Sequence, residues 1–235
     1  MRFTLLTAGF LLAMSGRALA APCVPGNLTN YLAVGSCSID SATFSAFNLV
    51  TPLPTGATPI STNTISVTPF STASGVGFLF GFDVRADAGI LRELLFGYQV
   101  NATGLTGAGL AMTGAGATDD GVVTGVQDVC VNGTFSTPPT GCSGSPKSNV
   151  VFQIDGDQQL TSMLLFPPTA LLAVVNDIAV DGGLSGFATL GGSVANTFTV
   201  AAAVPEPASL LLLGTGLTMI SRLRRSRVKK EDVCV

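Results

Sequence analysis

The stretch Val76-Gly77-Phe78-Leu79-Phe80-Gly81-Phe82-Asp83-Val84 places large apolar side chains at every second position. Successive side chains of a β-strand point to opposite faces, so this alternation predicts a strand with one face in a core. The same alternation recurs at Leu94, Phe96, Tyr98 and Val100, and at Val150, Phe152 and Ile154. No segment of comparable length shows the period of an amphipathic helix, and the chain is therefore expected to be rich in strands.

Turn-forming residues separate further apolar runs at the spacing of an antiparallel β-protein. These runs are Phe44–Val50, Ile65–Phe70, Val122–Val131, Leu160–Phe166, Leu171–Val180, Gly186–Leu190 and Thr197–Val200. We predict an all-β fold, a jelly-roll-like antiparallel β-sandwich over residues 21–203, with one short helix allowed at Ala86–Leu95. The Pro-rich segment Thr51–Pro59 is expected to be a loop, and Thr103–Thr118 either a flexible connection or a Gly-rich strand.

Composition excludes several chemistries. The 235 residues include no His, so Ser-His-Asp machinery and His-ligated zinc are impossible. The P-loop and dinucleotide-binding glycine patterns are missing as well. We therefore predict no catalytic residues, no metal and no cofactor. Between residues 21 and 203 only Arg85, Arg92 and Lys147 are basic, and this acidic balance argues against nucleic acid as a partner.

The first 20 residues have the three parts of a secretory signal peptide. Arg2 precedes the apolar run Phe3–Met14, and Ala18-Leu19-Ala20 provides a small-residue cleavage site. The alternative, a buried N-terminal helix, fits less well because Ser-Gly-Arg and then Ala-Pro follow the apolar run. We expect export through the inner membrane and cleavage after Ala20.

Residues 204–230 form a second signal. Pro205-Glu206-Pro207 is an extended peptide, because proline restricts both itself and the residue before it. The apolar run Ala208–Ser221 follows and is shorter than the roughly 20 residues of a comfortable transmembrane helix. A basic cluster closes the signal and is expected to remain cytoplasmic, with Arg222, Arg224 and Arg225 at its centre.

This arrangement resembles the PEP-CTERM sorting signal. The resemblance covers residues 204–227 and implies recognition by an exosortase, transient anchoring in the membrane through a hydrophobic sorting helix, and cleavage near Pro205–Pro207. An anchor that is never cut is the alternative. The stretches 31–40, 43–47 and 174–183 also resemble a group of PEP-CTERM proteins. This resemblance implies a β-rich secreted domain and brings no catalytic residues with it.

Four cysteines lie between the two signals: Cys23, Cys37, Cys130 and Cys142. An even number of cysteines in an exported domain favours two disulfides, and the spacing favours the local pairs Cys23–Cys37 and Cys130–Cys142 among the three possible connectivities.

Few other residues are candidates for a site. Asp119-Asp120-Gly121 and Asp155-Gly156-Asp157 have acidic spacing that calcium sites also use, but polar turns explain both segments better. Glu93 is the sole glutamate between residues 21 and 203, and it is expected on a solvated face beside Arg92. A sugar-binding surface would have to use Tyr31, Tyr98 or exposed Phe as aromatic platforms, since the chain has no Trp.

These observations lead to a first hypothesis of an exported, exosortase-sorted protein of the cell surface or extracellular matrix, with a structural or interaction role. A carbohydrate-binding or adhesion module, with extracellular polysaccharide as its partner, is the alternative. A hydrolase that uses Glu93 and an aspartate is the third and least favoured hypothesis.

Overall fold

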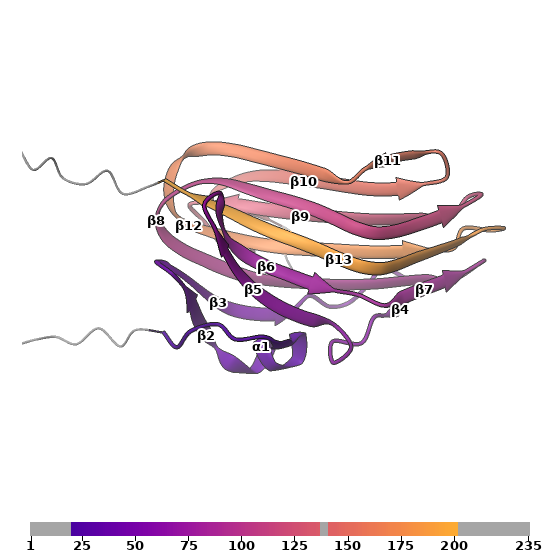
Figure 1. Cartoon of the computed structure of the whole chain (residues 1–235), viewed down its shortest axis with the longest axis horizontal. Coiled ribbons are helices and arrows are strands. Elements are labelled where there is room, and N and C mark those ends of the chain that lie inside the picture. Colours follow the sequence, from indigo (N-terminus) through magenta and orange to yellow (C-terminus); the bar gives the residue numbers. More distant parts are fainter. Residues whose placement is uncertain (1–19, 137–140, 202–235) are drawn as a thin grey trace, which may run out of the picture. The chain divides into compact units, whose positions relative to one another are not determined.

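The computed structural model describes residues 20–136 and 141–201. This part consists of strands and one short helix (Figure 1). The predicted sorting segment, and the predicted signal peptide apart from Ala20, lie outside the described residues. The elements are β1 (Gly26–Asn27), α1 (Leu28–Val34), β2 (Ser36–Ile39), β3 (Ala42–Leu49), β4 (Ala57–Pro59), β5 (Ser66–Thr72), β6 (Gly75–Gly81), β7 (Val84–Asp87), β8 (Leu91–Thr118), β9 (Val122–Val131), β10 (Ser145–Ile154), β11 (Asp157–Gln159), β12 (Thr161–Asp181) and β13 (Phe187–Val200).

One sheet folds back on itself to make the two layers. Its hydrogen-bonded order is β1-β5-β6-β13-β8-β12-β9-β10-β11. Outside this order, β3 pairs with β8 and with β2. The strand pairs are antiparallel except β4, which runs parallel to β8. Across the interior, a methyl group added at Gly125 of β9 would lie 3.9 Å from the side chain of Leu110 in β8. The predicted jelly-roll-like β-sandwich is confirmed.

Two long strands connect the layers. β8 has 28 residues and β12 has 21, and they pair with each other along most of their length. The first part of β8 has β3 as its other neighbour, whereas β13 replaces β3 from Leu105 onward. The register of β12 against β8 shifts between Leu165 and Leu171. Pro167 and Pro168 lie in this stretch and have no N–H to donate to the ladder. The long strands therefore run through both layers.

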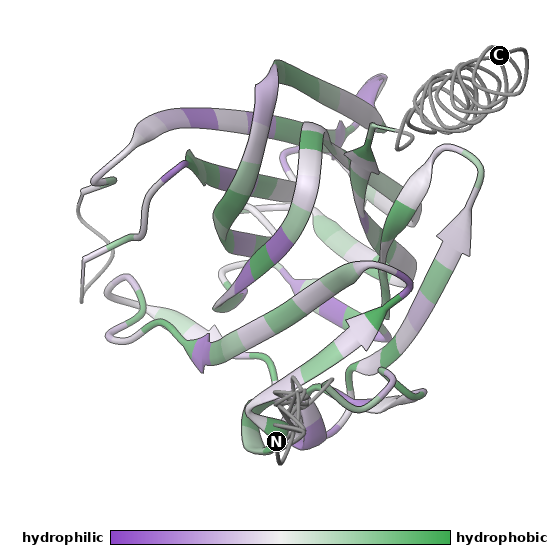
Figure 2. Ribbon diagram, turned by 90° about the vertical axis from the view of Figure 1, so that its left-hand side faces the viewer, coloured by the Kyte–Doolittle hydropathy of each residue, from purple (hydrophilic) through white to green (hydrophobic). Residues whose placement is uncertain are grey.

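The apolar face predicted from the first stretch is buried. Val76, Phe78, Phe80, Phe82 and Val84 all lie in the core, as do Leu94, Phe96, Tyr98 and Val100. Figure 2 shows this alternation as green and pale segments along the strands. Aromatic rings meet edge to face at the centre of the core, where the centroid of Phe78 lies 4.6 Å from that of Phe44 and 5.2 Å from that of Tyr31. Such pairs contribute about 0.5–1.5 kcal/mol each beyond the burial of their area.

Three local expectations need correction or refinement. Residues 103–118 are not a loop but a Gly-rich strand, the second part of β8, since the small residues there allow close neighbours. A methyl group at Gly109, for example, would lie 3.1 Å from the sulfur of Met163. No helix forms at Ala86–Leu95, because β7, a turn at Gly89 with φ of 75° and the start of β8 occupy it.

The face predicted for β10 is also wrong. Val150 is 43% exposed, while Val151, between the expected core positions, is fully buried. β10 is paired with β9 along its whole length, and this pairing, not the local pattern, decides which side of β10 faces the core.

The helix α1 was not expected from the sequence. Asn27 caps its first turn by accepting a hydrogen bond from the Asn30 N–H at 2.9 Å, and Gly35, with φ of 75°, ends it. Among the described residues, no helix has the length and the apolar character needed to cross a membrane.

Both predicted disulfides are confirmed. Cys23–Cys37 ties the segment before α1 to β2, and Cys130–Cys142 ties the end of β9 to the connection that leads into β10. Each closes a short loop, which in the chain-entropy model stabilises the fold by about 3 kcal/mol.

Candidate functional site

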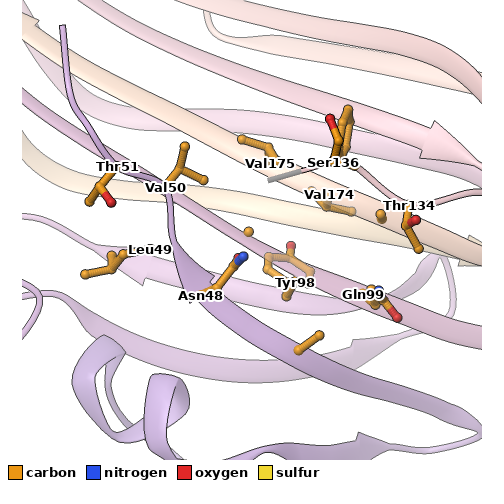
Figure 3. A pocket seen from close by; sticks show the side chains of 14 residues that line it. Asn48, Leu49, Val50, Thr51, Tyr98, Gln99, Thr134, Ser136, Val174 and Val175 are labelled. Carbon is orange, nitrogen blue, oxygen red and sulfur yellow. The ribbon is translucent and has the colours of Figure 1, made fainter. Parts of the chain in front are cut away.

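The side of the sheet that faces away from the core carries a groove over β8 and β12. We call it the central groove; it has a volume of about 250 Å³. Gly97 and Gln99 of β8 and Ala173 and Val175 of β12 form its floor, since these positions alternate with the core residues of the same strands. Two segments form its walls, residues 46–51 on one side and 134–136 on the other (Figure 3).

The first wall depends on a local irregularity of β3. Its register against β8 shifts between Ser45 and Asn48, and Ala46 there has φ of 55°. The shift brings Asn48 opposite Gly97. A methyl group at Gly97 would lie only 2.9 Å from the Asn48 side-chain oxygen. The missing side chain at Gly97 therefore lets Asn48 lie against the floor.

The second wall is fixed by covalent and hydrogen bonds. The disulfide partner Cys130 lies beside Ala173 of the floor, in the register of β9 with β12. The Thr134 N–H donates to Ser143 Oγ at 2.9 Å, and the Ser136 N–H donates to the Gly141 carbonyl at 3.0 Å. The disulfide thus holds residues 134–136 over the outer face of the sheet.

A second cavity, which we call the side cavity, adjoins the central groove and shares Leu49, Val50 and Thr51 with it. Its volume is about 320 Å³. The strand β4 closes it by pairing with the start of β8, and the Ile60 N–H donates to the Glu93 carbonyl at 2.9 Å. Its lining is mostly apolar, with Glu93 as its one ionisable residue.

Glu93 is not on a solvated face, contrary to the expectation from sequence. It is only 4% exposed. Burial, with a smaller contribution from the nearby carboxyl group of Asp177, which lies within hydrogen-bonding reach, raises its pKa to about 7. Burial also raises the pKa of Asp177, and the charge of Asp128 adds to this effect. Asp177 comes from β12, 84 positions later, and sequence reasoning had no signal that would pair it with Glu93.

Two atoms of this carboxyl pair are buried without a hydrogen-bond partner among the described residues. They are Oε2 of Glu93 and Oδ1 of Asp177. Glu93, Asp177 and Asp128 lie along a diagonal across β8, β12 and β9, on the outer side of the sheet. Within the described ranges, no group of three or more His, Cys, Asp or Glu side chains is placed to hold a metal ion.

The other sequence candidates have structural roles. Tyr31 and Tyr98 are buried in the aromatic core and cannot serve as sugar platforms. The Tyr31 hydroxyl donates to the Val24 carbonyl at 2.6 Å, and the Tyr98 hydroxyl donates to Asn196 Oδ1 at 2.7 Å. A pattern of alternation cannot distinguish a tyrosine of the core from one that binds a ligand. The packing of the folded chain shows that both tyrosines belong to the core.

The two acidic segments are turns. Asp155 and Gly156 connect β10 to β11. The carboxylate of Asp120 accepts hydrogen bonds from the N–H groups of Leu184, Ser185 and Gly186 at 2.7, 3.0 and 2.9 Å. These hydrogen bonds lower the pKa of Asp120 to about 2 and tie the turn after β8 to the turn before β13.

Comparison with solved structures gives only distant likenesses. TmCBM61, solved in complex with beta-1,4-galactotriose, has 9% identity and a TM-score of 0.30, with 67% of this chain and 88% of that chain covered. The enzymatically active domain of tailspike protein 4 of bacteriophage CBA120 has 11% identity and a TM-score of 0.24, with 68% of this chain and 20% of that chain covered. No curated protein matches the chain. Likenesses this weak carry no argument about function.

A family comparison identifies the second terminal signal. The family model described as the PEP-CTERM protein-sorting motif matches residues 203–227. The resemblance noted at residues 204–227 is thereby confirmed, although Pro205, Glu206, Pro207, Arg222, Arg224 and Arg225 lie outside the described residues. The chain carries a PEP-CTERM sorting motif, which marks it as an exported, exosortase-sorted protein that is anchored transiently in the membrane through this segment.

Proposed function

We propose that the β-domain acts at the cell surface or in the extracellular matrix as a non-catalytic structural or interaction protein. The observation that carries this proposal is the sorting motif at residues 203–227, next to a domain with two disulfides. Disulfides persist in oxidising compartments, which agrees with an extracellular destination. The signal peptide of residues 1–20 starts the export, and cleavage near Pro205–Pro207 ends it by releasing the domain from its transient anchor.

The intact mass of the protein recovered from its host's surface and medium tests this route. The expected species begins at Ala21, ends near Pro205 and gains about 4 Da when its two disulfides are reduced. Glu206→Ala serves as a processing-deficient variant, and a host strain without exosortase as a second control. Wild-type protein that still carries Arg222–Val235 in the normal host contradicts the proposal.

Binding of extracellular polysaccharide is the second candidate function, and the lining of the central groove favours it. Asn48, Thr51, Gln99 and Thr134 offer amides and hydroxyls, which can donate to or accept from sugar hydroxyl groups. Phe135 lines the same groove and is half-buried, and an aromatic side chain in such a place can stack on a sugar. This platform replaces the two tyrosines that the sequence offered.

Affinity electrophoresis in gels containing the host's exopolysaccharide tests the second candidate. Gln99→Ala and Phe135→Ala are each expected to weaken binding about tenfold, the loss of one good polar or stacking contact. Gln158→Ala, an exposed amide in β11 away from the groove, is the matched control and should bind as the wild type does. Equal retardation of all variants would exclude the central groove as the binding site.

A further inference from the structure

The carboxyl group of Glu93, which lines the side cavity, has no basic partner among the described residues. The walls of the cavity come from a part of the chain without charged residues, from Ser41 to Phe82. Arg92 precedes Glu93 in β8, so its side chain leaves the strand on the opposite face. Among the described residues the one ion pair joins Arg85 to Asp87. The other ionisable groups on the outer face of β12 and β9 are Asp177, Asp181 and Asp128, all of them acidic.

The base of the cavity also offers an acceptor that is not in use, next to a second carboxyl group. Glu93 lines the cavity, and its side chain is buried, with only 4% of the residue's surface exposed. Its Oε2 atom has no hydrogen-bond partner. Asp177 does not line the cavity, but it lies within hydrogen-bonding reach of Glu93 and keeps Oδ1 without a partner. Buried acceptors in native proteins almost always have a donor, so two unused oxygens in one carboxyl pair indicate a place for a donor from outside.

The walls limit the kind of molecule that brings this donor. Val50, Leu53, Pro54, Ile60 and Leu95 surround the 320 Å³ of space above Glu93, and they offer contact to aliphatic groups but few hydrogen bonds. A calcium ion requires six to eight oxygen ligands, which this lining does not supply. A sugar ring would leave most of its hydroxyl groups facing apolar side chains. A primary ammonium group on an aliphatic stem matches both the charged base and the apolar walls.

We propose that the side cavity binds a primary ammonium group carried on an aliphatic stem, as in a lysine side chain, with Glu93 as its acceptor and the carboxyl group of Asp177 adding negative charge next to Glu93. This site is separate from the central groove and goes beyond the proposed function, which does not depend on it. The ammonium group provides the positive charge that the carboxyl pair lacks, while the stem packs against the walls.

The proposal has a definite pH dependence. With a pKa of about 7, Glu93 retains a proton over much of the range below neutrality. The protonated carboxyl group is neutral and attracts a cation less strongly than the carboxylate does. An ammonium group that binds must displace the proton. Affinity is therefore expected to rise between pH 6 and pH 8, where an alkyl amine itself remains fully protonated.

Titration of the mature protein with two small probes tests the site. The first probe is Nα-acetyl-lysine methylamide, and the second is Nα-acetyl-norleucine methylamide, which has the same stem without the ammonium group. We expect saturable binding of the lysine probe, at least tenfold weaker binding of the norleucine probe, and a severalfold gain in affinity for the lysine probe from pH 6 to pH 8. Calorimetry, or NMR shifts if the affinity is weak, provides the measurement.

Variants connect the binding to the carboxyl pair. Glu93→Gln keeps the size of the side chain and is expected to reduce affinity for the lysine probe tenfold or more, whereas the exposed-turn variant Asp155→Asn should leave it unchanged. Asp177→Asn provides the same test if Glu93→Gln does not fold. Equal affinity for the two probes, no saturable binding of the lysine probe, or tighter binding of Ca²⁺ or glucosamine that Glu93→Gln abolishes would overturn the proposal. None of these results affects the mass experiment on sorting.

Discussion

At the scale of single residues, Glu93 makes the stability of the domain depend on pH. Its pKa is about 7 in the folded protein against an ordinary 4.5, so the folded state binds the proton more tightly than the unfolded state. Stability is therefore lost as the pH rises from about 4.5 to about 7. Glu93→Gln removes this loss, and the variant should gain on the order of 1–2 kcal/mol over the wild type at pH 8 but not at pH 4.

Urea unfolding of both proteins between pH 4 and pH 8 measures this difference. Asp155→Asn, which changes an exposed carboxyl group in a turn, is the matched control and should follow the wild type at every pH. A constant difference between Glu93→Gln and the wild type across the range would mean that Glu93 titrates normally.

Asp120 makes the stability of the domain depend on pH in the opposite direction. Hydrogen bonds from Leu184, Ser185 and Gly186 lower its pKa to about 2 from an ordinary 3.8, so its contribution to stability is complete above about pH 4 and is lost as the pH falls toward 2. Asp120→Asn should lower the Tm at pH 6, and its difference from the wild type should disappear near pH 2. The neighbouring Asp119→Asn is the control. If both variants melt alike at pH 6, the connection between the two turns does not stabilise the domain.

At the scale of elements, the Cys130–Cys142 disulfide is expected to control one wall of the central groove without controlling the fold. The pairing of β9 with β10 runs from Val131 with Ser145 to Val122 with Ile154 and does not need the disulfide. Removing both cysteines with Cys130→Ser and Cys142→Ser should cost about 3 kcal/mol of stability and speed amide exchange at residues 134–136.

Hydrogen exchange followed by residue, together with urea unfolding, measures both effects. The matched control removes the other disulfide with Cys23→Ser and Cys37→Ser, which should cost a similar free energy and leave exchange at residues 134–136 slow. Unchanged exchange in the first variant would show that hydrogen bonds such as that of Thr134 to Ser143 suffice to hold the wall.

At the scale of the whole molecule, the sequence predicted what local patterns determine. Alternation placed Val76–Val84 and Leu94–Val100 correctly, and the number and spacing of the cysteines gave both disulfides. Prediction from the sequence failed where contacts between distant segments determine which face of a strand is buried. Val150 faces outward because of its pairing with β9, and Glu93 is buried because β4 and β12 lie against it. The carboxyl pair and the central groove both form between strands far apart in the chain, so no local signal revealed them.

The position of β13 has a mechanical consequence. The sorting segment follows directly after this strand, which ends at Val200 and is hydrogen-bonded to β6 and β7 on one side and to β8 on the other. While the tail is held in the membrane, any pull on the domain enters through β13. To extract that strand, a force must break ladders on both sides together, and an interior strand therefore resists tension better than an edge strand would. The position of β13 therefore favours a domain that stays folded while its sorting segment is anchored in the membrane.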